Sequence, residues 1–407
     1  MKYKIGQEIY RLPPCPAWDI AGMESWLAEM AEKGLHLAHD GFFCGFAGFV
    51  CGEPQKVRYR LEAAQRKTGL WSDNDGEPEK EEIELGEKYS WEYVAKRGDF
   101  FIYRTADPSA RELHTDPTVQ ALALNAVKKR KRGAVLDAVV LLVVYPILMT
   151  RGCLLLTAVS MGTWWTALVL LFAVLMIAGE VKAWRYLSRI QKALTEDGFY
   201  SAEPNGKKRR AAYCAEKAVK IVLAVVLACA LLRNWGVTVT NENQIALADY
   251  TADLPFATIA DLAGENSTDY RQNMTAMGRE FNTLEEKTDI LAPRMIEYNE
   301  EASVRQADGR LIDGGLYVEY YKMRNEKLAE WLTEEIYRFE KLKKHFEPLT
   351  APPLKADFAA AYRDELHFPT VLIRKGRVVI KTYFYQTSAY KIPLETWTEA
   401  VCEGLEE

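Results

Sequence analysis

Three long apolar runs stand out from the mixed polar and apolar pattern of the chain, and all three lie in its middle third. They cover residues 134–156, 161–179 and 218–232. A helix adds about 1.5 Å per residue, so roughly 20 apolar residues are needed to cross a hydrocarbon core of about 30 Å. The pattern therefore predicts three transmembrane helices, of which the third is the shortest.

The connection between the first two runs has two candidate positions. Arg151 and Gly152 could form the turn, or residues 159–163 could turn while Arg151 extends its side chain to the interface. We favour the second position, because it makes the two predicted spans similar in length.

Basic residues flank these runs on one side only. Residues 128–132 are all Lys or Arg, and residues 180–217 contain a second basic cluster at 207–210, whereas the turn between the first two runs offers Arg151 alone. Lys and Arg collect in short cytoplasmic loops. The charge pattern therefore predicts a multi-pass cell-membrane protein with a cytoplasmic N-terminus and an extracytoplasmic C-terminus. The first eleven residues lack an apolar segment, so we expect no cleavable signal peptide.

This organisation divides the chain into six predicted segments. The mean hydropathy of -0.20 is that of a protein that is mostly outside the membrane. The segments are a cytosolic domain (1–105), a basic juxtamembrane linker (106–133), a transmembrane hairpin (134–183), a basic cytosolic connection (184–216), a third transmembrane helix (217–235) and an extracytoplasmic domain (236–407).

The first 105 residues alternate between patterns typical of strands and of helices. We predict strands at 4–12, 35–46 and 56–62, a charged helix at 77–85, and a hairpin formed by 90–94 and 99–104. Asp19 is a suitable N-cap for a further helix that Gly34 ends. The order of these elements predicts a ferredoxin-like α+β sandwich.

Several sequence blocks in this region carry a resemblance. The blocks are WDIAGMESWLAEMAEKGLHL at 18–37, YRLE at 59–62, WEYV at 91–94 and FIYR at 101–104. Together they resemble a bacterial membrane family called domain of unknown function 2812. The resemblance covers roughly residues 1–105. It implies membrane spans after the domain and, from the frequent presence of PadR-type transcription regulators beside the family, a regulated or regulatory membrane system. It supplies no activity and no site residue.

The C-terminal region is acidic and long enough for its own core. Residues 236–407 contain 30 acidic and 20 basic residues. We predict an α+β domain of unassigned fold. Its predicted strands are 237–240, 290–298, 316–322, 370–374 and 377–385, and its predicted helices are 325–346, 357–363 and 394–405.

Few residues are candidates for chemistry. His36, His39 and Asp40, with Cys44 and Cys51 nearby, do not have the spacing of a zinc site, and residues 36 and 39 point to opposite faces of a strand. We interpret them as polar residues near a turn.

The remaining candidates lie at the first span and in the C-terminal region. Asp137 is one turn from the basic cluster, so we interpret it as solvated or paired with Arg132. Two acidic pairs, Glu334 with Glu335 and Asp364 with Glu365, are interpreted as solvated faces, and His345 and His367 complete the set. We therefore predict no catalytic, cofactor-binding or metal-binding residues and no cofactor.

The sequence favours a non-enzymatic membrane protein that couples a cytosolic to an extracytoplasmic domain, with a sensory, regulatory or scaffolding role in the bacterial envelope. Alternatives are an accessory subunit of a transporter complex and an envelope enzyme that uses the acidic outer domain. The predicted partners are anionic inner-leaflet lipids at the basic clusters and a protein in the membrane or cytosol. We expect no nucleic acid, because the clusters flank apolar spans.

Overall fold

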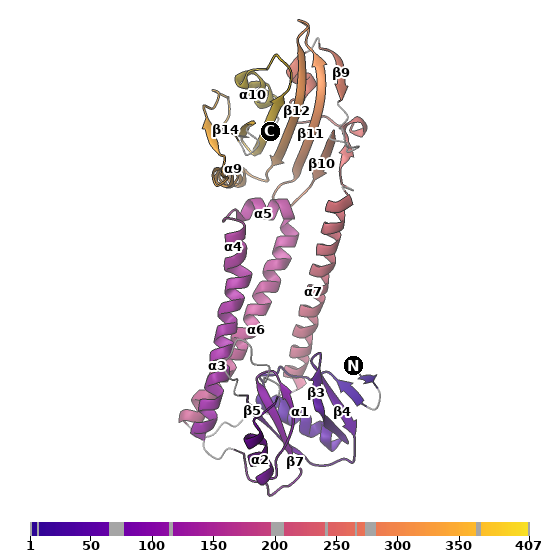
Figure 1. Cartoon of the computed structure of the whole chain (residues 1–407), viewed down its shortest axis with the longest axis vertical. Coiled ribbons are helices and arrows are strands. Elements are labelled where there is room, and N and C mark those ends of the chain that lie inside the picture. The colour runs from indigo at the N-terminus through magenta and orange to yellow at the C-terminus, as the bar shows by residue number, and fades with distance from the viewer. Residues whose placement is uncertain are drawn as a thin grey trace. The chain divides into compact units, whose positions relative to one another are not determined.

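The computed structural model describes most of the chain (Figure 1). The described residues are 2–5, 8–64, 77–113, 117–196, 207–240, 243–264, 267–272, 282–363 and 368–405. Internal contacts divide the chain into two compact units. The N-terminal unit contains Met1–Val143 and Leu171–Val226, and the C-terminal unit contains Val144–Leu170 and Leu227–Glu407.

Helix α1 (Ile20–Glu32) organises the N-terminal unit. It begins at the predicted N-cap, where the Asp19 carboxylate accepts a hydrogen bond from the Gly22 N–H at 3.2 Å. Its apolar residues, including Trp26 and Leu27, are buried. Gly34 follows the helix with a φ of 74°, a conformation that glycine adopts without strain. The predicted helix is therefore confirmed together with both of its ends.

The strands of this unit form two sheets. One has the order β1 (Lys2–Ile5), β2 (Glu8–Arg11), β4 (Phe46–Cys51) and β3 (Leu35–Phe43), and the other has the order β5 (Arg58–Ala63), β7 (Phe100–Thr105) and β6 (Glu92–Arg97). Helix α2 (Lys80–Lys88) precedes β6. A ferredoxin-like sandwich has a single sheet, so the finer fold prediction is not confirmed for the described residues. The predicted hairpin before residue 105 is confirmed.

The predicted strand at 4–12 is wrong. This segment forms the antiparallel strands β1 and β2, with Tyr3 opposite Tyr10. The alternating pattern of polar and apolar residues is the same on both strands of such a pair, so it does not reveal where the chain turns back.

Three long helices complete the N-terminal unit, and two of them enter its core. Helix α3 (Pro117–Val139) contributes Leu124 and Val127, and α6 (Thr163–Glu196) contributes Leu187 and Ile190, to the core that α1 and both sheets share. The third is α7 (Lys207–Thr240). The first turns of α3 thus lie within the segment that the sequence analysis interpreted as a linker.

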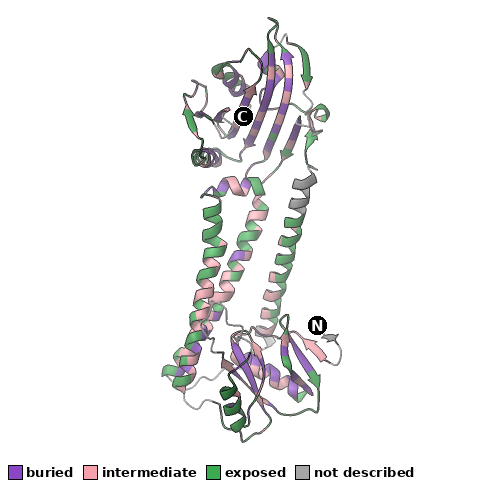
Figure 2. Ribbon diagram, in the orientation of Figure 1, coloured by how far each residue is buried: buried purple, intermediate pink, exposed green. Residues whose placement is uncertain are grey.

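Two helices in the described part of the chain are long and apolar enough to cross a membrane. They are Pro117–Met149 and Thr163–Glu196. Of the residues in the most apolar 18-residue stretch of each helix, 0% and 6%, respectively, are buried. Figure 2 shows these segments as largely exposed or intermediate. This supports two of the three predicted spans. In α7 the described apolar stretch is short, because Glu216, Lys217 and Lys220 precede residues 221–232 and the side chains beyond residue 232 are not described.

The connection between these two helices uses both predicted turn positions. The first helix continues through a π-helical turn (Val140–Val144) and α4 (Tyr145–Met149). Arg151 and Gly152 then adopt φ values of 52° and 75°, helix α5 (Leu154–Met161) follows, and Gly162 turns the chain into α6 with a φ of 96°. The first apolar run, 134–156, therefore extends past the end of α4 at Met149, through the turn and into the start of α5.

The C-terminal unit is built on a large antiparallel sheet. Its described strands follow the order β13 (Glu347–Leu349), β14 (Phe358–Arg363), β15 (Pro369–Lys375), β16 (Val378–Gln386), β12 (Leu311–Lys322), β11 (Arg294–Arg305), β10 (Thr283–Lys287) and β8 (Ile245–Ala246), and β9 (Thr268–Gln272) also pairs with β11. A 3₁₀ turn (Leu247–Asp249) follows β8. Helices α8 (Ile259–Ala263) and α10 (Leu394–Glu403) pack into one core cluster with the sheet, and α9 (Glu326–Lys341) packs with α5 into another. This confirms the α+β class.

The predicted elements of this unit have mixed outcomes. The hairpin around Lys375 and Gly376, the helix capped by Asn325 and the C-terminal helix are confirmed. Residues 237–240 belong to α7 instead of a strand, because β-branched residues lower helix propensity only slightly. Residues 357–363 contain strand β14 instead of a helix, because pairing with β15 overrides the helix propensity of its alanines.

Candidate functional site

The sequence candidates His36, His39, Asp40, Cys44 and Cys51 do not form a metal site. His36 Nε2 lies 2.9 Å from the carbonyl oxygen of Glu53, and His39 pairs with the adjacent Asp40. Cys44 and Cys51 are exposed free thiols. Within the described ranges, no three His, Cys, Asp or Glu side chains come together as metal ligands.

Three of the acidic candidates have clear positions. Asp137 is exposed on α3. Glu334 is exposed on α9, as interpreted, but the interpretation of Glu335 as solvated is wrong. Its side chain is 2% exposed and accepts a hydrogen bond from the Leu156 N–H at 2.8 Å, because α5 packs over it. Asp364, Glu365 and His367 lie outside the described residues, and His345 is exposed.

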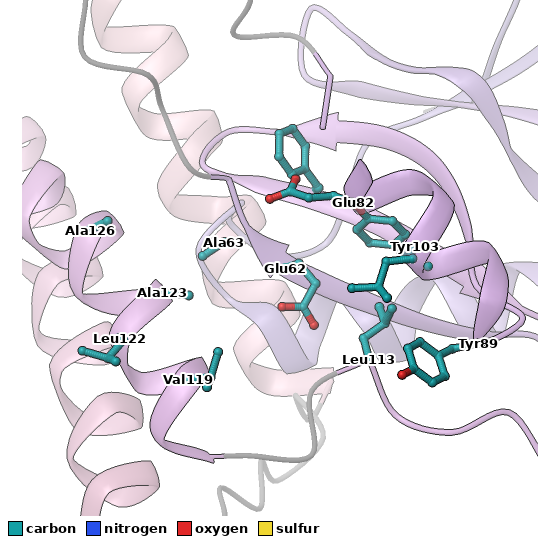
Figure 3. Close-up of a pocket in the computed structure, with 13 residues that line it drawn as sticks. Glu62, Ala63, Glu82, Tyr89, Tyr103, Leu113, Val119, Leu122, Ala123 and Ala126 are labelled. Atoms are coloured by element: carbon teal, nitrogen blue, oxygen red, sulfur yellow. The ribbon is translucent and has the colours of Figure 1, made fainter. Parts of the chain in front are cut away.

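The N-terminal unit contains a solvent-open pocket between α2 and α3 (Figure 3), which we call the α2–α3 groove. Its volume is about 450 Å³. Strands β5 and β7 form its floor, α2 and α3 supply its walls, and Leu113 also lines it. The lining residues are Glu62, Ala63, Glu82, Leu85, Gly86, Tyr89, Phe101, Tyr103, Leu113, Val119, Leu122, Ala123 and Ala126.

Large apolar side chains in this groove are exposed to water. Leu122 is 66% exposed and Val119 is 45% exposed on α3, while Leu85 is 52% and Tyr89 is 37% exposed on or next to α2. Burying such a side chain completely is worth about 1.5–3 kcal/mol. A ligand or partner that covers this apolar surface would therefore gain binding free energy.

Carboxylates line one side of the groove. The phenol of Tyr103 has a raised pKa, first because it is buried and then because the carboxylates of Glu82 and Glu62 face it. Lys96 of the edge strand β6 places its ammonium 5.9 Å from the centre of the Phe101 ring, which also lines the groove. The groove thus combines an apolar interior with a negative rim.

An ion network holds the wall that contains Leu113. The Arg60 guanidinium donates to the Glu112 carboxylate at 2.8 and 3.0 Å and to Glu24 at 3.0 Å. Trp91 Nε1 donates to the carbonyl oxygen of Arg111 at 2.7 Å. Burial raises the pKa of Glu24 to about 7, an effect that Arg60 opposes. These contacts hold residues 111–112 against Arg60 of β5 and against Trp91.

The sequence analysis missed the groove because its walls come from two segments about 35 residues apart. The sequence does contain one indication of it, because the apolar residues of α3 form two separate stripes. Residues 121, 124 and 127 are buried, while residues 119, 122, 123 and 126 form a second apolar stripe on the same helix. A helix with two apolar stripes packs against two partners.

The fold and the groove define an α+β protein with two helices that are apolar enough to span a membrane. Residues 19–136 match the model of the family described as Protein of unknown function (DUF2812). The match contains the α2–α3 groove and extends beyond the first 105 residues into α3. No curated protein and no solved structure matches the chain.

Proposed function

We propose that the protein is an integral membrane protein that couples a cytosolic domain to an extracytoplasmic domain. The exposure of the apolar helices supports the membrane part of this proposal. Leu141 and Leu148 in the first candidate span are each 65% exposed, and Val174 in the second is 62% exposed. A core helix of a water-soluble protein would bury such residues, whereas lipid accommodates them without cost.

Ion pairs join three helices at one level of the N-terminal unit. Lys131 of α3 lies 3.4 Å from Glu180 of α6, and Lys182 of α6 lies 2.8 Å from Glu216 of α7. Glu216 also pairs with Lys220 of its own helix at 2.9 Å. We call these residues the ionic layer. The apolar part of each helix begins within about a turn of it, which is the arrangement expected of helices that enter a bilayer together.

One observation carries the proposal: each folded domain holds a different end of helix α6. In the N-terminal unit, Tyr186 Oη donates to the Asp19 carboxylate at 3.0 Å, and Leu187 is buried in the core. In the C-terminal unit, the Thr163 N–H donates to Asp289 at 2.8 Å where α6 begins. The 23 residues between these contacts span about 35 Å of helix.

This distance matches the thickness of a bilayer core. A crossing by α6 therefore puts the two domains on opposite sides of the membrane. Helix α7 must then cross as well, because Arg210 near its start is bound to Glu29 of α1 and the chain after it enters the outer sheet at β8. The proposed membrane part accordingly has three crossings, with α7 as the third.

The distribution of basic residues supports a cytosolic location for the N-terminal domain. Within the 128–132 cluster, Lys128, Arg130 and Lys131 bind partners inside the protein. Lys129 and Arg132 are exposed and are the residues we assign to anionic lipid, at about 1 kcal/mol per charge.

The proposed role is sensory or regulatory. Helix α5 is buried against α9 of the C-terminal unit through Leu155 and Val159, and α5 leads through Gly162 directly into α6. A ligand that moves α5 on α9 would therefore move the start of a helix whose other end is part of the N-terminal core. The family-matched domain supplies the surface that a cytosolic partner would read.

Hydrogen exchange on the full chain in lipid nanodiscs tests this coupling. The substitution Val159→Ala weakens the packing of α5 and should change the protection of residues 186–194 at least twofold. The matched control Val174→Ala removes the same atoms from the lipid-exposed side of α6 and should leave these residues unchanged. An effect of Val159→Ala confined to the C-terminal unit contradicts the proposal.

A further inference from the structure

The α2–α3 groove has the characteristics of a docking site for a helix. We propose that it binds an amphipathic helix of a partner protein, with apolar residues on the buried face and Lys or Arg residues beside α2. This inference rests on the proposed function in one respect, because it requires the groove to face the cytosol.

The apolar residues of the groove follow helical spacing. Val119, Leu122, Ala123 and Ala126 stand at i, i+3, i+4 and i+7 of α3, which makes a continuous stripe of nearly two turns. Across the groove, Leu85 lies one turn before Tyr89. Grooves formed by two helices commonly receive the apolar face of a third, with anchors at the same spacing.

Charge complementarity identifies the polar face of the partner. Residues 77–88 contain six acidic residues and two basic ones, and Glu82 lies on the groove itself. Figure 3 shows the Glu82 and Glu62 carboxylates between the α3 residues of the groove and the Tyr103 side chain. A partner with Lys or Arg beside its apolar residues would pair with this rim, whereas an acidic partner would be repelled.

The position of the groove argues against a lipid chain as the occupant. Leu122 precedes Lys131 of the ionic layer by nine residues of continuous helix, which is about 13 Å. An acyl chain would have to pass the headgroup region to reach it. The acidic rim also disfavours the anionic headgroups that the exposed basic residues attract.

Photo-crosslinking in native membranes tests the proposal. The full chain carries a benzophenone amino acid at position 122, and a matched control carries it at position 136, which is also an exposed leucine on α3 but lies in the apolar window. We expect position 122 to form a protein adduct whose sequenced peptide has apolar residues at helical spacing and a net positive charge. Position 136 should label lipid.

Charge reversal then tests the assigned polar face. Glu82→Lys with Glu84→Lys changes exposed residues of α2 and should lower the adduct yield at least fivefold, whereas Glu334→Lys with Glu330→Lys on exposed positions of α9 should leave it unchanged. The proposal would be overturned if position 122 formed no adduct, or formed one with lipid, with a second copy of this chain, or with an acidic or neutral peptide. It would also be overturned if the charge reversal on α2 left the adduct yield unchanged.

Labelling of Cys44 in intact cells separates this inference from the proposed function. If a membrane-impermeant maleimide reaches Cys44, the proposed orientation fails and the groove does not face the cytosol. If Cys44 is protected and no adduct of the expected kind forms, the groove proposal alone fails.

Discussion

The contact between α5 and α9 depends on one buried carboxylate. Glu335 accepts the Leu156 N–H at 2.8 Å, and Leu156 lies in the first turn of α5, where backbone N–H groups have no partner within the helix. The substitution Glu335→Ala removes the acceptor of this N–H. It therefore tests whether α5 is held by the C-terminal unit.

The expected cost follows from the charge of the acceptor and its burial. A hydrogen bond to a charged group contributes about 1.5–3 kcal/mol, and the helix N-terminus adds to the attraction of a carboxylate. The side chain is only 2% exposed, so water does not replace the lost bond. A loss of about 2 kcal/mol corresponds to a roughly 30-fold increase in the opening equilibrium of α5, at tenfold per 1.4 kcal/mol.

Hydrogen exchange followed by mass spectrometry on peptides from residues 153–162 measures this opening. We expect exchange to increase by about 30-fold in Glu335→Ala and by only about fivefold in Glu335→Gln, because the amide oxygen of glutamine can still accept. Glu334→Ala is the matched control, since Glu334 is the exposed neighbour on the same helix. If residues 153–162 exchange at the same rate in Glu335→Ala and Glu334→Ala, the Glu335 carboxylate does not hold α5. The C-terminal unit would then not fix the start of α6 through this contact.

Three further substitutions test other parts of the structure. Leu187→Ala in the N-terminal core should lower the free energy of unfolding by about 2–5 kcal/mol, measured with denaturant. Val174→Ala on the exposed side of α6 should change it by less than about 0.5 kcal/mol. Equal effects of the two substitutions would refute the assigned core. The pKa of Glu24 is raised from 4.5 to about 7, so the native state keeps this proton to a higher pH than the unfolded chain does. The free energy of unfolding of the wild type should therefore fall by a few kcal/mol as the pH rises from about 4.5 to 7, and Glu24→Gln should flatten this profile. An unchanged slope in the variant would contradict the assignment. Gly315→Ala should lower the melting temperature, because the added Cβ would lie 2.4 Å from the Tyr385 ring, and a neutral effect would show that the ring moves freely.

Local signals in the sequence identified the elements whose ends are set by their own residues. Asp19 and Asn325 cap α1 and α9 through side-chain oxygens that accept the N–H of the residue three positions later, as N-cap residues do. The turn at Lys375 and Gly376 follows from the positive φ of the glycine. These features depend on neighbouring residues only, so no tertiary information is needed to predict them.

Features that depend on distant contacts were not predictable from the sequence. Glu335 and Glu334 are the same residue type side by side, and only the packing of α5 makes one of them buried. Residues 358–363 favour a helix by composition, but Tyr362 is buried in a strand beside β15. The groove likewise depends on the position of α2 beside α3, which their separate patterns do not reveal.

Labelling of single positions with a membrane-impermeant maleimide tests the central claim most directly. Cys44 is an exposed thiol of the N-terminal domain, and Ala389→Cys places an exposed thiol in the C-terminal domain. We predict that intact cells label position 389 and leave Cys44 unlabelled, and that permeabilised cells label both. Labelling of both positions in intact cells, or of neither, would put the two domains on the same side of the membrane and contradict a third crossing by α7.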